Sequence, residues 1–173
     1  MKIKSYLFYG IIFSLTIIGK IAYAQATNDA LVFILKPLSS IISFLTNSPF
    51  IYLSDSGFYF ESLNITIDKS CSGVNFWIIS FVVFSFSFVK VTRSNFQRLL
   101  SIPVLLLATF AFTLFANTSR ILISILISRQ TAFDYPWLHQ AQGVFIYLSL
   151  LVIAYTIINH LSFKFNNYHE ELT

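Results

Sequence analysis

Residues 99–119 are LLSIPVLLLATFAFTLFANTS, a run without a charged side chain. A bilayer core of about 30 Å is crossed by roughly 20 apolar residues in a helix, so this run predicts a membrane span. Three more runs of similar length are nearly free of charge, at about residues 6–24, 74–90 and 140–160. The sequence therefore predicts an all-α polytopic membrane protein with about four transmembrane helices.

The composition of the whole chain supports a lipid environment. Of 173 residues, 56% are hydrophobic and 10% are charged, whereas about a quarter of a soluble domain is charged. A soluble protein of this length lacks the interior volume to bury so many apolar side chains. The net charge of +4 is too small and too scattered to indicate nucleic-acid binding. The length favours one membrane-embedded domain over residues 1–173.

Basic residues between the predicted spans set the orientation. The short segment Lys90–Arg98 contains basic residues and no acidic ones, so the positive-inside rule places it in the cytoplasm. Four spans with both termini inside put Lys2 and Lys164 on the same side. The first span has an alternative, because Ala22–Ala24 also fits the cleavage site of a signal peptide. We predict a retained span.

The segment between the first two predicted spans has a different pattern. Residues 30–48 have a stripe of apolar side chains at helical spacing, with Lys36 and serines between them. The stripe consists of Leu31, Ile34, Leu35, Leu38, Ile41, Ile42 and Leu45. This pattern predicts an amphipathic helix that lies on the membrane, with a kink at Pro37. A fifth span here would move the basic loop outside, so we reject it. Aromatic residues around Ser54–Gly57 and the alternation in Ile65–Ile67 predict a small extracytoplasmic β-hairpin.

Three reactive side chains lie at the outer ends of three different spans in this topology. Cys71 comes just before the second span, Arg120 follows the third, and His139 precedes the fourth. They offer a nucleophile, a fixed cation and a group that titrates near neutral pH. Because the predicted topology places all three at one depth on one side, we expect them to form one site.

The residues around Cys71 favour a reactive thiol. Ser72, Gly73 and Asn75 follow it at the start of the second span, where we expect them to support substrate binding or the oxyanion. A helix N-terminus also stabilises the negative charge of a thiolate. Gly73 would let another chain approach the sulfur closely. Considered alone, a single cysteine is more often a small buried apolar residue than a nucleophile.

Arg120 lies between the uncharged runs Leu99–Ser119 and Ile121–Ser128. An arginine in such surroundings needs a specific partner or a function, although contact with lipid headgroups is the simpler alternative. Asn117, one turn earlier, would help Arg120 to stabilise an oxyanion. The two runs together are too long for one straight crossing. We therefore expect the chain to bend or to leave the membrane near Asn117–Arg120, with irregular backbone where it lines an enclosed site.

His139 follows the segment Tyr135–Leu138, whose composition is typical of an aromatic belt at a membrane interface. An interfacial aromatic is therefore one interpretation of His139. As a member of the site it would be the general acid or base. The sequence contains no histidine–carboxylate cluster that predicts a metal ion, and we expect no cofactor.

These motifs resemble the exosortase/archaeosortase family. They are Cys71-Ser-Gly at the start of one span, Asn117-Thr-Ser-Arg120 at the end of another, and His139 before the last. The stretch Asp68–Phe76 is most similar to the short exosortase K branch. The resemblance implies a membrane cysteine protease or transpeptidase at the outer face of the cytoplasmic membrane. It also implies Cys71 as nucleophile, Arg120 as stabiliser of the oxyanion or thiolate, and His139 as general acid or base.

The implied partner is an exported protein with a C-terminal sorting signal, made of a short motif, a transmembrane helix and a basic tail. Two other functions compete with this interpretation. In a small transporter, Arg120 would be a substrate or gating charge, and paired charges or broken helices would be expected within the membrane. A non-catalytic subunit of an envelope-assembly complex would use the aromatic-rich exterior as a docking surface.

Overall fold

The structure is a computed structural model, which describes residues 5–92, 94–130 and 136–170. It contains five long helices, a small antiparallel sheet and three short 3₁₀ helices, here labelled η. The elements in chain order are α1 (Ser5–Gln25), η1 (Asp29–Leu31), α2 (Val32–Thr46), β1 (Ile51–Leu53), β2 (Gly57–Phe60), η2 (Glu61–Leu63), β3 (Ile65–Ile67), η3 (Lys69–Cys71), α3 (Val74–Val91), α4 (Asn95–Gln130) and α5 (Pro136–Glu170).

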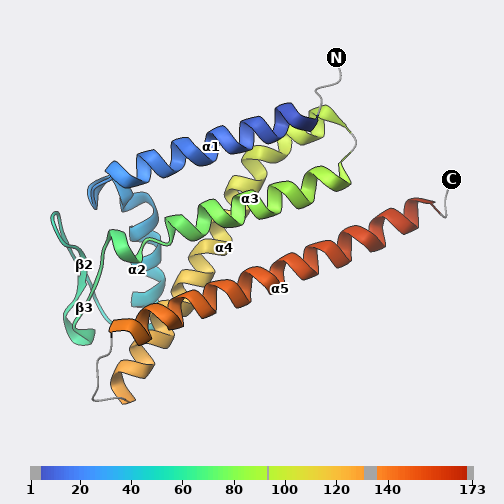
Figure 1. Ribbon diagram of the computed structural model, residues 1–173. Helices are drawn as coiled ribbons and strands as arrows, with labels where there is room; N and C mark the ends of the chain where they lie inside the picture. The colour runs from blue at the N-terminus through green and yellow to red at the C-terminus, as the bar shows by residue number, and fades with distance from the viewer. Residues whose placement is uncertain (1–4, 93, 131–135, 171–173) are drawn as a thin grey trace.

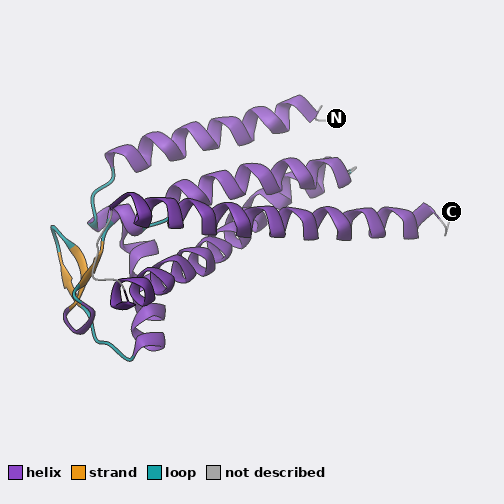
Figure 2. Cartoon of the chain, turned by 60° about the horizontal axis from the view of Figure 1, so that its bottom comes forward, coloured by secondary structure: helices purple, strands orange, loops and turns teal. Residues whose placement is uncertain are grey.

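The long helices form a bundle with the sheet at one end (Figures 1 and 2). Helix α3 packs against α1, α4 and α5, and α4 also packs against α5. Among the described residues, five helices are long and apolar enough to cross a membrane. The structure thus confirms a mostly helical, polytopic membrane protein, as the apolar runs in the sequence predict.

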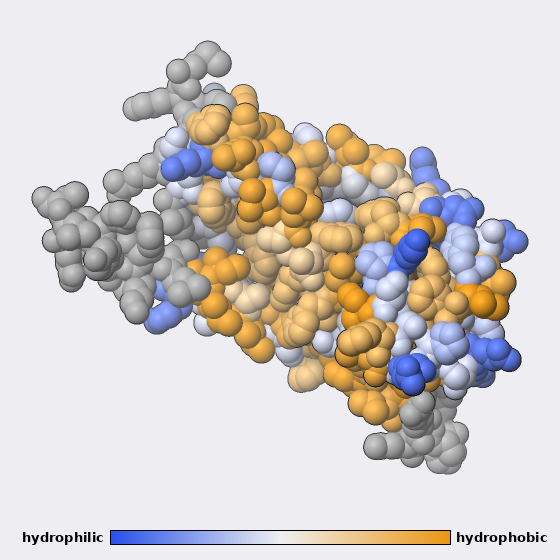
Figure 3. All heavy atoms as spheres, turned by 180° about the vertical axis from the view of Figure 1, so that it is seen from behind, coloured by the Kyte–Doolittle hydropathy of each residue, from blue (hydrophilic) through white to orange (hydrophobic). Residues whose placement is uncertain are grey.

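The outer and inner surfaces of the bundle suit a lipid environment. Large apolar side chains point outward on three helices, with Phe13 67% exposed on α1, Leu107 71% on α4 and Phe145 71% on α5. Hydrophobic residues cover the middle of the face in Figure 3, and hydrophilic ones gather toward the end that carries the sheet. Small polar side chains such as Ser80 and Thr113 are buried between helices, as is common in membrane bundles.

Helix α2 runs crosswise at the end of the bundle where α1 ends and α3 begins (Figure 1). The Lys69 ammonium donates to the carbonyl oxygens of Ala24 (3.0 Å) and Ala26 (2.8 Å). The chain therefore leaves α1 and returns to α3 at the same end, although α2 has the composition of a span. Pro37 lies inside α2 without ending it.

The predicted amphipathic face of α2 is the face that the structure buries. Five apolar side chains at helical spacing form the main hydrophobic core together with the inner face of the sheet, namely Leu31, Ile34, Leu35, Leu38 and Ile42. Two other members of the predicted stripe, Ile41 and Leu45, are exposed. The helix therefore presents apolar residues both to the core and outward, which suits a position at the edge of the bilayer.

The sheet has one strand more than the predicted hairpin. Its order is β1-β2-β3, with Tyr52 opposite Phe58 and Phe58 opposite Ile67. The third strand is the alternating segment Ile65–Ile67, which pairs with β2 because its buried Ile67 side chain reaches the same core as Phe58 and Phe60. The sheet thus covers α2 at the end of the bundle and leads the chain directly to η3.

Helix α4 differs from the expectation of a bend or break. It is one continuous helix of 36 residues through Asn117–Arg120, with Pro103 inside it. At 1.5 Å per residue such a helix is about 54 Å long, well beyond a hydrocarbon core of about 30 Å. It runs diagonally across the bundle in Figure 1. A helix of this length fits such a core when it is tilted or when one end extends beyond the core. The continuous helix contradicts the prediction of irregular backbone near Asn117–Arg120.

Candidate active site

A short turn, η3, places Cys71 just before α3. The Asp68 carboxylate accepts hydrogen bonds from the Ser70 amide (2.9 Å) and the Ser70 hydroxyl (2.6 Å), and the Cys71 amide donates to the Asp68 carbonyl (2.9 Å). The Cys71 side chain is half-buried, and its Sγ lies 3.8 Å from the Ser70 hydroxyl oxygen. Asp68 therefore shapes the turn that presents the thiol.

Helix α1 holds the same turn from one side. The Tyr23 hydroxyl donates to the Lys69 carbonyl (3.1 Å) and accepts from the Ser72 hydroxyl (3.4 Å). The Lys69 ammonium lies 5.3 Å from the centroid of the Tyr23 ring, which is a cation–π distance. Ser72 is fully buried. These contacts fix η3 to the C-terminal end of α1, so Ser72 contributes to the shape of the site from within.

Gly73 explains how close α4 comes to the start of α3. Its φ is +71°, in the left-handed region, where it caps the N-terminus of α3. A Cβ at this position would lie 3.1 Å from Nδ2 of Asn117 and 3.2 Å from Cγ2 of Thr113. Glycine is thus required both by the backbone conformation and by the neighbouring side chains. The chain that approaches closely at Gly73 is α4 of the same protein.

Asn117 joins three helices in the interior. Its side chain is 1% exposed. Its amide nitrogen donates to the main-chain carbonyl oxygen of Cys71, and its amide oxygen accepts from the Tyr147 hydroxyl at 2.5 Å. The amide therefore links the Cys71 turn to α4 and, through Tyr147, to α5.

Arg120 lies one turn after Asn117 and meets the same tyrosine. Its guanidinium carbon is 5.5 Å from the centroid of the Tyr147 ring. A Cβ added at Gly143 on α5 would lie 3.2 Å from Cδ of Arg120. The Nε of Arg120 is buried and has no hydrogen-bond partner among the described residues. The arginine is thus directed at α5 with an uncommitted donor, which is a costly state for a buried group unless a ligand uses it.

Asn75 and His139 are the two remaining residues predicted for the site. Asn75 is exposed, and its side-chain oxygen accepts from the Lys20 ammonium at 2.7 Å, so it takes part in the contact between α1 and α3. His139 lies in the first turn of α5, which begins at Pro136, and it precedes the apolar span Ala141–His160 within that helix. Its backbone lies one helical turn before Gly143. The side chain of His139 lies outside the described part of the structure.

Tyr147 and Tyr23 belong to this network, although neither was predicted as a site residue from the sequence. The sequence holds only a weak indication of the role of Tyr147. Tyr147 lies inside a long uncharged run, and a tyrosine hydroxyl buried among apolar residues usually needs a hydrogen-bond partner. Gly143 and Tyr147 are also spaced by four residues, so they share one face of α5. Both of them contact Arg120.

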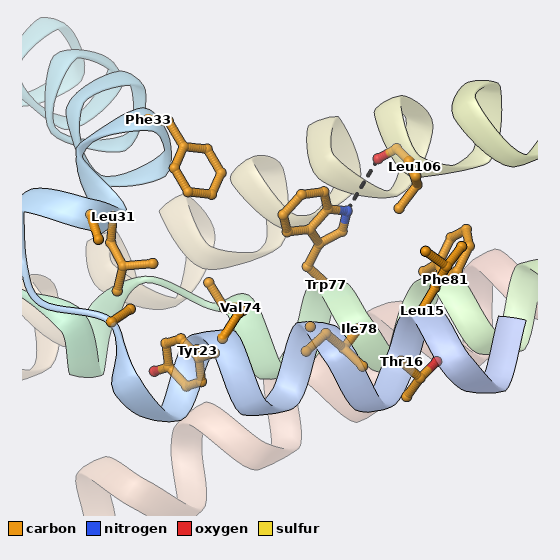
Figure 4. A pocket seen from close by; sticks show the side chains of 14 residues that line it. Leu15, Thr16, Tyr23, Leu31, Phe33, Val74, Trp77, Ile78, Phe81 and Leu106 are labelled. Carbon is orange, nitrogen blue, oxygen red and sulfur yellow. Dashed lines mark hydrogen bonds between the residues drawn. The ribbon is translucent and has the colours of Figure 1, made fainter.

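A cavity of about 350 Å³ opens between α1, α2, α3 and α4 (Figure 4). Its wall is almost entirely apolar and includes Leu15, Phe33 and Ile78. The Trp77 indole nitrogen at its edge is already engaged, since it donates to the Leu106 carbonyl at 3.1 Å. None of Cys71, Asn117 and Arg120 lines this cavity. The cavity therefore suits a hydrocarbon group, and Tyr23 belongs both to its lining and to the network around Cys71.

Comparison with known proteins identifies the family of the chain. The family described as transmembrane exosortase (Exosortase_EpsH) matches residues 5–156. No curated protein and no solved structure matches the chain. The matched region includes all five long helices up to Thr156 in α5, together with Cys71, Arg120 and His139. The chain therefore belongs to the transmembrane exosortase family.

Proposed function

We propose that this exosortase is a cysteine protease or transpeptidase that cleaves the C-terminal sorting tails of exported proteins. Membership of the family implies this class of enzyme. The observation that supports the proposed site most strongly is the bond from Asn117 to the Cys71 carbonyl, because it fixes the thiol-bearing turn one helical turn from Arg120. The transporter alternative expects broken helices, whereas α3, α4 and α5 are continuous over their described lengths.

In the proposed mechanism Cys71 attacks the carbonyl carbon of the scissile bond. His139 takes the thiol proton, and a new S–C bond forms while the carbonyl oxygen becomes an oxyanion. The Arg120 guanidinium donates hydrogen bonds to that oxyanion. When the C–N bond breaks, the imidazolium of His139 gives its proton to the leaving amine. The product is a thioester on Cys71, and the tail is released.

The second half of the reaction consumes the thioester. Water or an acceptor amine attacks the thioester carbon, and His139 accepts a proton from that nucleophile. The S–C bond breaks, and the proton returns to the sulfur. Hydrolysis leaves a free carboxyl end on the exported protein, whereas transfer joins that end to an acceptor in the envelope. The same three side chains serve both outcomes.

The other predicted site residues have supporting roles in this proposal. Asn117 acts mainly by positioning, because its amide is engaged by Cys71 and Tyr147. Ser72 and Gly73 shape the turn from inside. Asn75 is exposed in the first turn of α3, where it could contact a substrate, and its side-chain oxygen accepts a hydrogen bond from Lys20.

We place the site at the outer face of the cytoplasmic membrane, in a four-span topology with α2 at the interface. The basic segment Lys90–Arg98 includes the last residues of α3 and the first of α4, at the end of α3 opposite Cys71, and the positive-inside rule puts that segment in the cytoplasm. A tail-anchored substrate would bring its scissile bond to this depth by inserting its own helix. The motif Asp68–Phe76 further supports assignment to the K branch of the family.

The experiment that tests the function compares Cys71→Ala with the unsubstituted protein in cells that also express an exported protein with a C-terminal motif, apolar helix and basic tail. Processing is followed as the loss of the tail from that protein. We expect Cys71→Ala to abolish processing, while membrane insertion, measured by carbonate extraction, stays unchanged. Normal processing in that variant would remove Cys71 from the mechanism. Tyr155→Phe, on the far part of α5, is the control and should process normally.

A further inference from the structure

We propose that Tyr147 is a positioning residue of this site, which fixes the Cys71 turn through Asn117 and seats the guanidinium of Arg120. The contacts of Tyr147 do not depend on whether the Cys71 thiol is catalytic, but the importance of Tyr147 for turnover rests on the proposed function. Tyr147 lies on α5, Asn117 and Arg120 lie on α4, and Cys71 precedes α3. One side chain would therefore set the relative position of three helices at the site.

The hydroxyl of Tyr147 holds the Asn117 amide in the orientation that the Cys71 carbonyl requires. An asparagine side chain has an acceptor oxygen and a donor nitrogen that exchange places on a half-turn. The Cys71 carbonyl can only accept, so the amide nitrogen faces it and donates to it, and the Tyr147 hydroxyl donates to the amide oxygen at 2.5 Å. The reversed orientation would bring two acceptor oxygens together at Cys71. Without the hydroxyl, the buried amide oxygen would lose its partner, and the amide would be held less firmly against the Cys71 carbonyl.

The ring of Tyr147 has a second task. It stacks on Phe76 of α3, with ring centroids 4.5 Å apart and an interplanar angle of 13°. The Arg120 guanidinium carbon lies 5.5 Å from the Tyr147 centroid, where the face of an aromatic ring attracts a cation. Gly143, one turn earlier on α5, leaves room for the Arg120 side chain. The ring thus holds the arginine in place, while no residue in the described part of the chain bonds to its Nε.

The single cysteine of the sequence allows a direct test of the link from the Tyr147 hydroxyl through Asn117 to the Cys71 carbonyl. Incorporation of [1-¹³C]cysteine labels only the main-chain carbonyl of Cys71, because the chain has one cysteine. Infrared spectra of the purified protein then show the stretching band of that carbonyl apart from the unlabelled ones. We expect the band to move to higher wavenumber in Tyr147→Phe, since the less firmly held amide of Asn117 donates a weaker hydrogen bond to the carbonyl. A larger shift in the same direction should appear in Asn117→Ala, which removes the donor.

Tyr155→Phe removes a hydroxyl from the same helix, two turns further on, and should leave the band in place. Only the monodisperse folded fraction of each variant is measured, so a loss of folded protein cannot imitate a shift. If the band of Tyr147→Phe coincides with that of the unsubstituted protein while Asn117→Ala shifts it, then Asn117 acts without Tyr147. The proposal would then be overturned.

The effect on turnover distinguishes this proposal from the proposed function. If Cys71 is catalytic, Tyr147→Phe should slow processing at saturating expression of the test substrate, and Tyr147→Leu, which also removes the ring seat of Arg120, should slow it further. Suppose that the carbonyl band shifts in Tyr147→Phe while Cys71→Ala processes normally. This result would contradict the catalytic role of Cys71 and still support Tyr147 as the residue that orders the turn. If instead the band stays in place in Tyr147→Phe while Cys71→Ala abolishes processing, the catalytic role of Cys71 is supported and the role of Tyr147 is contradicted.

Discussion

The side-chain amide of Asn117 on α4 donates a hydrogen bond to the main-chain carbonyl of Cys71, 46 positions earlier in the chain. This bond joins the thiol-bearing turn to the helix that carries Arg120. Both ends of the contact are braced, by Tyr23 on α1 at the turn and by Tyr147 on α5 at the amide. The candidate site is therefore built on helices and not on a free loop, which favours precise positioning of its groups.

The close packing at Gly73 predicts that a single added methyl group disturbs the site. Gly73→Ala forces alanine into the left-handed region, which costs about 1–2 kcal/mol, and places a Cβ 3.1 Å from Nδ2 of Asn117. We expect lower thermal stability in detergent and strongly reduced processing. Gly10→Ala is the matched control, because no atom lies within 4 Å of the added Cβ. It should raise stability by roughly 0.5–1 kcal/mol. Equal stability of the two variants would contradict the packing described at Gly73.

Gly143→Ala tests the seat of Arg120 from the other side. The added Cβ would lie 3.2 Å from Cδ of Arg120, so the flexible arginine must move by a few tenths of an ångström or more. Stability should change little, because alanine is favoured in a helix interior. Processing should fall by on the order of tenfold or more, since small misplacements of catalytic groups are costly. An unchanged processing rate would show that the exact position of Arg120 is unimportant.

Arg120→Lys separates charge from geometry. Lysine keeps the positive charge but loses the planar, forked array of donors. If Arg120 stabilises the oxyanion, the rate of tail cleavage should fall by about 10²–10³-fold, the usual effect of removing one such donor. The rate is measured by pulse–chase labelling of the exported test protein. Near-normal cleavage would identify Arg120 as an anchor to lipid headgroups.

The position of α2 predicts the membrane topology. Reporter domains fused after Thr27 and after Ser48 should both lie outside, because α2 begins and ends at one end of the bundle. A reporter fused after Lys164 should be cytoplasmic. Enzymatic activity of side-specific reporters gives the answer. A change of side between Thr27 and Ser48 would make α2 a fifth span, and export of the reporter at Lys164 would exclude the four-span topology.

Much of the fold could be predicted from the sequence, because lipid selects for long apolar runs that are visible in it. The helical spacing of Leu31, Ile34 and Leu38 also indicated the buried face of α2. The continuity of α4 could not be predicted, since the tilt that accommodates a long helix depends on its neighbours. The alternation in Ile65–Ile67 indicated extended structure. Its pairing with β2 as a third strand could not be predicted, because that pairing depends on the burial of Ile67 in the core.

The candidate site was only partly predictable for a similar reason. The sequence could place Cys71, Asn117 and Arg120 at one end of the bundle, because that follows from span order. It could not show that Asn117 binds a main-chain carbonyl, or that Tyr147 meets both Asn117 and Arg120, because such contacts depend on the rotation of each helix about its axis. The spacing of Gly143 and Tyr147 became informative only once α5 was seen to pack on α4.

The proposed mechanism requires Cys71 and His139 to lie within reach of one another beside Arg120, and a cysteine cross-link measures that proximity. The His139→Cys variant has two cysteines, since the natural chain has one, and mild oxidation links them only where their Cα atoms come within about 7 Å. A short bis-maleimide extends the reach. The control is His160→Cys, 21 residues further along α5 and about 30 Å away.

The cross-link is measured in native membranes by the mass of the peptide that joins positions 71 and 139. If Cys71 and His139 are neighbours, linkage should be efficient in His139→Cys and absent in His160→Cys. No linkage at position 139 with either reagent, or equal linkage at the two positions, would contradict the proposed mechanism.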